Sequence, residues 1–129
     1  MDNPFEPLSW AAQAEEDFAL AQSALRRKIP LTYGATFHAQ QCIEKYFKAV
    51  LMATHVPFPK THDLVALSDL CLQVGIILPV DMDDLERLNA YSVLVRYPGN
   101  RATVEEAQEA VHIMRTLRRF LRKHLGIEK

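Results

Sequence analysis

The sequence predicts an all-α protein with five helical segments. Apolar residues recur at spacings of three and four along every long stretch, which is typical of helices that bury one face. No stretch shows the sustained alternation of apolar and polar residues that is typical of strands. Because proline disfavours helix in the residue before it, the prolines mark the gaps between the segments. They are Pro4 and Pro7 before the first segment, Pro30 after it, Pro57 and Pro59 after the second, Pro79 after the third and Pro98 after the fourth.

The composition indicates one globular domain, residues 1–129, with its own hydrophobic core. Of the 129 residues, 49% are hydrophobic and 24% are charged, and a chain of this length buries roughly two thirds of its unfolded surface. Cys42 and Cys71 lie inside apolar helical patterns, as buried thiols do in a reducing compartment. The acidic, proline-containing start is unlike a signal peptide, and the apolar runs are too short to cross a bilayer. We therefore expect a cytoplasmic protein without membrane contact.

The first segment is expected to begin at Ser9 as N-cap and to end near Lys28. Asp17 lies at the edge of its apolar stripe, and a buried carboxylate is costly unless it is paired. We therefore expect Asp17 to have a structural role and to meet a cation or donor from another helix. The stripe consists of Trp10, Ala14, Phe18, Ala21 and Leu25.

The second segment, Thr32 to His55, is predicted to be the central helix because its apolar residues follow the helical spacing most closely. They are Ile43, Tyr46, Phe47, Val50 and Leu51. A polar row lies beside them, made of His38, Gln41, Lys45 and Lys48, and Glu44 precedes Lys48 in the order that favours a surface pair. This row is interpreted either as a solvated face or as one wall of a site.

The third and fourth segments begin at recognisable capping residues. Thr61 is the expected N-cap of the third, with Asp63 placed to interact with the helix dipole. The fourth is expected to begin near Asp81 or Met82 and to continue to Arg96 and Tyr97, where Pro98 and Gly99 stop it. Arginine at such an end either caps carbonyls of its own helix or binds a phosphate. Three groups of residues follow from the spacing: Leu64, Leu67, Leu70, Cys71 and Val74 in the third core stripe; Leu85, Leu88, Leu94 and Val95 in the fourth; and Asn89, Ser92 and Arg96 in a second polar row, with Arg101 nearby.

The fifth segment has the clearest start, because Thr103 and Glu106 form a capping box. Its broad apolar face, from Val104 to Leu125, predicts contact with more than one neighbour. Residues 113–125 carry five cations and no acid, whereas residues 1–20 carry five acids and no cation. This asymmetry is explained either by helix dipoles or by a surface that faces RNA or a partner protein. The five cations are Arg115, Arg118, Arg119, Arg122 and Lys123, and the apolar face consists of Val104, Ala107, Ala110, Val111, Ile113, Met114, Leu117, Phe120, Leu121 and Leu125.

The order of these motifs resembles the prokaryotic HEPN domain family. The motifs are Trp10 with Asp17, then FHAQQCIEKYFKAVL, KTHDL, YSVLVRYPG and the capped TVEEA helix, and together they cover residues from about Ser9 to Leu125. The resemblance, to the short stand-alone form, implies an up-and-down bundle of four to five helices, often dimeric. It also implies nucleotide binding and a two-component, toxin–antitoxin-like pairing with a small nucleotidyltransferase.

Many members of this family are metal-independent ribonucleases that carry an arginine, four to six further residues and then a histidine. Their histidine handles the proton of the attacking 2′-hydroxyl and their arginine stabilises phosphate charge. Here Arg96 is followed by Tyr97, Pro98, Gly99, Asn100, Arg101, Ala102 and Thr103, and the next histidine is His112. We therefore assign no catalytic residue and leave enzyme activity open.

The working hypothesis is a groove that binds a nucleotide or RNA, or docks a nucleotidyltransferase, without strong catalysis and without a cofactor or metal. Arg96 and Lys48 are expected to contact phosphate, and Tyr97 to offer a stacking face. The predicted groove residues are His38, Gln41, Lys45, Lys48, His62, Arg96, Tyr97 and Arg101. Two alternatives remain: a ribonuclease that uses His38 or His62 as an unorthodox base, and an inert module in which the fifth helix makes a homodimer or heteromer.

Overall fold

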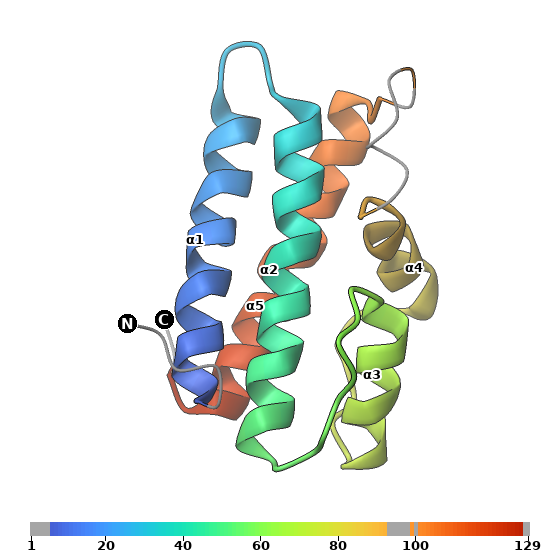
Figure 1. Ribbon diagram of the computed structural model, residues 1–129. Helices are drawn as coiled ribbons and strands as arrows, with labels where there is room; N and C mark the ends of the chain where they lie inside the picture. The colour runs from blue at the N-terminus through green and yellow to red at the C-terminus, as the bar shows by residue number, and fades with distance from the viewer. Residues whose placement is uncertain (1–5, 93–98, 100, 128–129) are drawn as a thin grey trace.

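The computed structural model describes residues 6–92, 99 and 101–127, and this part of the chain forms five helices and no strand. The all-α prediction is confirmed. The long helices α1, α2 and α5 lie together, and the short helices α3 and α4 pack beside them (Figure 1). The helices are α1 (Pro7–Arg26), α2 (Thr32–Ala53), α3 (Leu64–Gln73), α4 (Met82–Ala90) and α5 (Val104–Leu125). No helix in the described ranges is long and apolar enough to span a membrane.

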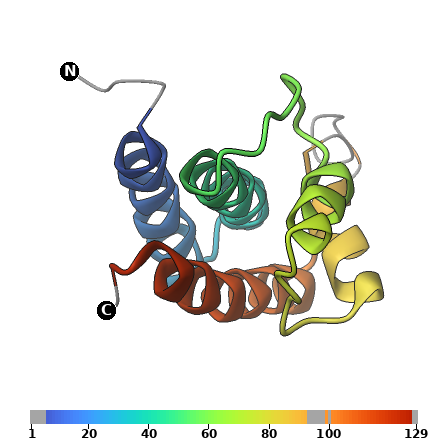
Figure 2. The same ribbon diagram turned by 90° about the horizontal axis from the view of Figure 1, so that it is seen from below.

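The central position predicted for the second helix is confirmed. Seen along its axis, α2 lies between α1, α5 and the α3–α4 pair (Figure 2). Its five predicted core residues, Ile43, Tyr46, Phe47, Val50 and Leu51, are at most 1% exposed. Because α2 contacts every other helix, it buries residues on nearly all sides, polar ones included.

Both cysteines are buried and free, as expected from their apolar surroundings. Burial raises the pKa of the Cys71 thiol to about 11 and holds that of Cys42 well above its usual range. Because the thiolate is the reactive form, neither residue is suited to act as a nucleophile.

Two predicted helix starts are wrong and two are confirmed. Helix α1 begins at Pro7 with Glu6 as N-cap. Ser9 therefore lies inside the first turn. Pro7 is tolerated at the first helical position because the backbone N–H that proline lacks would have no partner there. Helix α3 is capped by the Asp63 carboxylate, whose Oδ1 accepts from the backbone N–H groups of Val65 and Ala66, whereas the Thr61 hydroxyl accepts from Asp63 N. Asp81 caps α4, and the Thr103–Glu106 capping box starts α5 as predicted.

The fourth helix is shorter than expected. It ends at Ala90, with Tyr91 as C-cap, instead of continuing to Arg96 and Tyr97. Asn89, predicted as the first member of a second polar row, connects two helices. Its Oδ1 accepts from Leu64 N at 2.8 Å and its Nδ2 donates to the Asp63 carboxylate at 2.9 Å, so it joins α4 to the start of α3. Ser92 is buried and donates to Asn89 O. Leu94, Val95 and Arg96 lie outside the described residues.

The remaining core stripes are confirmed except near helix ends. Val74 and Val104 are 44% and 37% exposed, because one follows the last residue of α3 and the other opens α5. Helix α5 packs against α1, α2 and α4, which confirms that its broad apolar face meets several neighbours.

Candidate functional site

An open pocket of about 870 Å³ lies where α2 ends and the connection to α3 begins. Trp10 of α1 forms one side, and the segment 55–62, which leaves the lower end of α2 in Figure 1, forms the other. Aromatic and aliphatic side chains make most of the lining, and four residues with a cationic or imidazole group are placed among them. The lining residues are Trp10, Lys48, Met52, His55, Val56, Pro57, Phe58, Pro59, Lys60, Thr61 and His62.

The wall of this pocket is held by the carboxylate of Glu44, which is 3% exposed. Lys48 Nζ donates to Glu44 Oε2 at 3.0 Å, and His62 Nδ1 lies 2.8 Å from Oε1. Gln40 Nε2 fixes the same segment by donating to the backbone oxygen of His62 at 2.9 Å. Gln41 Nε2 adds a contact to Glu44 Oε1 at 3.4 Å.

The expectation that Glu44 and Lys48 form a surface pair is wrong. The Lys48 side chain is 7% exposed, and its ammonium also lies 5.4 Å from the centre of the Trp10 ring. The i, i+4 spacing is the same in exposed and buried pairs, so burial depends on α1 and the 55–62 segment covering this side of α2.

Trp10 and Phe58 give the pocket its aromatic side. Their rings meet edge to face, with centroids 6.3 Å apart. His55 follows the end of α2 with a φ of 60°, the left-handed conformation that closes many helices. That conformation is uncommon for residues other than glycine, although histidine tolerates it better than most.

Asp17 has the structural role predicted for it. The carboxylate is buried and binds two residues of α2, with His38 Nδ1 2.8 Å from Oδ1 and Lys45 Nζ 2.6 Å from Oδ2. His38 and Lys45 thus join α1 to α2, and neither lines the pocket.

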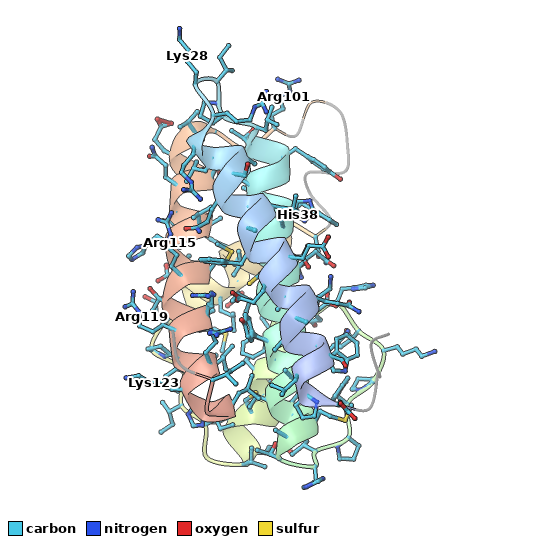
Figure 3. The ribbon with its side chains drawn as sticks, turned by 90° about the vertical axis from the view of Figure 1, so that its left-hand side faces the viewer. Lys28, His38, Arg101, Arg115, Arg119 and Lys123 are labelled. Atoms are coloured by element: carbon cyan, nitrogen blue, oxygen red, sulfur yellow. The ribbon has the colours of Figure 1, made fainter. Side chains whose placement is uncertain are left out.

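The eight predicted groove residues are therefore divided among different places. Lys48 and His62 line the pocket, and Gln41 contacts the Glu44 carboxylate behind it. Arg101 is exposed and lies at the end of the bundle that carries Lys28, with His38 further down (Figure 3). Arg96 and Tyr97 lie outside the described residues, so their convergence with Lys48 stays a prediction.

Sequence reasoning missed most of the pocket lining, above all His55, Phe58, Lys60 and the Trp10 ring as a wall. The available signal was the stretch Val56-Pro57-Phe58-Pro59-Lys60, in which an aromatic residue between prolines precedes a cation. In the sequence, its prolines indicate only a gap between two helices. In the described ranges, no cluster of three or more histidine, cysteine or acidic residues is suited to bind a metal.

The comparisons with known proteins identify the family of the chain. The family model described as HEPN domain matches residues 8–124 of the 129-residue chain. No curated protein and no solved structure matches the chain. The family match spans all five helices almost to the end of α5. The chain therefore belongs to the HEPN domain family.

Proposed function

We propose that this HEPN protein binds a nucleotide, or the end of an RNA strand, in the pocket between Trp10 and the 55–62 segment. Family membership supports a nucleotide- or RNA-related function. The observation that carries the proposal is the combination, in one pocket of about 870 Å³, of two aromatic rings with lysine and imidazole groups. Aromatic faces stack on bases of any sequence, and cations bind phosphates.

Within the pocket, the roles follow from which charges are already neutralised. Glu44 neutralises Lys48, so this lysine orients the wall more than it attracts an anion. Lys60 is exposed and forms no ion pair among the described residues, which leaves its charge available for a phosphate. His62 is 70% exposed and is held at Nδ1 by Glu44, which leaves its other ring nitrogen for a contact with a ligand.

The binding proposal is tested with Trp10, the single tryptophan of the chain. AMP and a 5′-phosphorylated tetranucleotide are expected to change Trp10 fluorescence with saturation.

Phe58→Ala should weaken binding about tenfold, since a stacking contact contributes about 1–3 kcal/mol. Lys60→Gln should weaken binding of phosphorylated ligands more than that of adenosine. Arg87→Gln, on the exposed side of α4, is the matched control and should leave affinity unchanged.

We also propose that the protein acts in a two-component system with a nucleotidyltransferase, as a homodimer and without strong catalysis of its own. Support for the partner comes from the family resemblance. The missing histidine after Arg96 supports the absence of strong catalysis. Native mass measurement tests the homodimer, and co-purification with a nucleotidyltransferase encoded beside the gene tests the partnership. A monomer that does not bind this partner would contradict the proposal.

A second candidate function, a ribonuclease with an unorthodox base, is favoured by the contact between Glu44 and His62. A carboxylate can only accept hydrogen bonds, so Nδ1 of His62 carries the proton and Nε2 is left as the basic nitrogen. Such a carboxylate–histidine pair is the arrangement that general bases use. Lys48 adds a cation beside the pair.

Labelled RNA incubated with the pure protein in chelator separates the two functions. The proposed binding function predicts intact RNA. The ribonuclease alternative requires cleavage that His62→Gln abolishes by at least about a hundredfold, the usual scale of a lost general base. His38→Gln tests the other candidate base, because His38 makes the same kind of contact with Asp17 outside the pocket. Cleavage that persists in both variants would point to a contaminating nuclease.

A further inference from the structure

The five cations at the end of the chain are divided between two faces of α5. Arg118 and Arg122 face α1, where Arg118 makes two hydrogen bonds of 2.7 Å to the Glu15 carboxylate and Arg122 lies 3.5 Å from it. Arg115, Arg119 and Lys123 are exposed and lie along one side of α5 (Figure 3). We call these three residues the basic stripe.

The basic stripe is regular and its charge is not neutralised. Its members are four residues apart, so they repeat about every 6 Å along the helix axis. None of the three forms an ion pair with any residue that the structure describes. From Gln108 to Gly126, the exposed side of α5 carries one acid, Glu109, which is bound to Arg87.

The guanidinium of Arg115 is positioned by a neutral group. Its Nε donates to Gln22 Oε1 at 2.7 Å, and Arg26 Nε donates to the backbone oxygen of the same glutamine at 3.4 Å. A neutral amide oxygen, from a side chain or from the backbone, orients an arginine without cancelling its charge. Arg115 and Arg26 therefore keep their remaining N–H donors for a ligand. Gln22 thus joins α1 to Arg115, the first residue of the basic stripe, and the exposed Arg26, Arg27 and Lys28 follow Gln22 toward the end of α1.

The surroundings favour a phosphate backbone over a protein surface. Ala19 lies between Glu15 and Gln22 on the face of α1 that meets α5, and it is exposed and small. Glu16 follows Glu15 in the chain and therefore lies about a quarter of a turn from it around the axis of α1. Stable protein interfaces have a buried apolar centre, which no residue of the basic stripe provides. Arginine matches the geometry of phosphate oxygens with its paired donors.

We propose that the basic stripe binds the phosphate backbone of an RNA strand, independently of sequence, and that this contact continues toward Arg26 and Lys28. It is a second surface, separate from the Trp10 pocket. An RNA strand held along α5 is thus bound through charge, whereas the pocket binds through stacking on aromatic rings.

The test measures the affinity for a 20-nucleotide single-stranded RNA of mixed sequence at several salt concentrations. Each phosphate contact to a single strand contributes about 0.7 to the slope of log K against log salt. Replacing all three residues (R115Q, R119Q and K123Q together) should therefore lower the magnitude of the slope by about 2. Binding at low salt should weaken at least about tenfold. Circular dichroism should show an unchanged helix content, because the three side chains are exposed.

Two controls make the result decisive. R87Q removes an exposed helical arginine on α4, so it should leave the slope unchanged, and the single variant R119Q should lower it by about 0.7. Equal losses in R87Q and R119Q would overturn the proposal, because they would indicate an effect of overall charge. A triple variant with the parent slope, or parent protein that binds polyglutamate as tightly as RNA, would also overturn it. AMP binding read by Trp10 fluorescence should be the same in all variants, which separates this test from that of the pocket.

Discussion

Replacing Glu44 with alanine is expected to lower the free energy of unfolding by about 3–5 kcal/mol, the usual cost of removing one partner from a buried ion pair. Lys48 is 7% exposed and would be left buried without the acid that pairs with it. His62 and Gln41 would lose the same acceptor. The wall of the pocket should therefore loosen together with the fold.

Urea unfolding followed by circular dichroism measures this change. Arg87→Gln removes exposed ion pairs instead and should change the free energy of unfolding far less than Glu44→Ala does. The double variant E44L/K48M replaces the pair with apolar side chains of similar size and should recover most of the stability lost in Glu44→Ala, since two apolar partners leave no buried charge. A loss below about 1 kcal/mol in Glu44→Ala would show that Lys48 reaches water and that the pair is not buried in solution.

The second large effect is expected at Glu15, where replacement with glutamine should cost about 2–3 kcal/mol. Glu15 accepts two hydrogen bonds from Arg118, and its carboxylate also binds the hydroxyl of Tyr46, to which Arg122 donates at 2.9 Å. Hydrogen bonds to charged groups contribute more than neutral ones. Because this cluster joins α1, α2 and α5, its loss should appear in global unfolding.

The same carboxylate predicts how stability depends on pH. Burial raises the pKa of Glu15, but the hydrogen bonds from Arg118 and Tyr46 and the charges of Arg118 and Arg122 outweigh this and lower it below 4.5. Since the folded-state pKa is the lower one, the contribution is fully present above about pH 4.5 and is lost as the pH falls through the folded-state value.

Urea unfolding of the parent protein and Glu15→Gln between pH 3 and 7 tests this sign. The difference between the two proteins should be constant near neutral pH and should shrink in acid. Glu16→Gln, at the next position on α1, removes an exposed acid without a partner among the described residues and should change stability by less than about 0.5 kcal/mol. A difference that grows as the pH falls would contradict the assignment.

The helices and most of the core were predictable because local rules decide them. Helical spacing identified the buried face of α2, and capping chemistry placed the starts of α4 and α5. The start of α1 was wrong because the helix begins at Pro7 after Glu6, whose side chain makes no capping hydrogen bond, and the start of α3 was wrong because Thr61 and Asp63 both qualify as caps. At such places the choice depends on small differences between competing hydrogen bonds.

By itself, the sequence determined the all-α class, the central helix and the pairing of Asp17 with cations. Its motifs also indicated membership of the HEPN domain family. Only the tertiary structure decided that the Glu44–Lys48 pair is buried, that the pocket is built by Trp10 and the 55–62 segment, and which cations of α5 remain exposed. The physical reason is that periodicity describes how a residue is placed on its own helix. Burial, charge neutralisation and pocket shape depend on which other helix or loop covers that face, and residues far apart in the chain supply this cover.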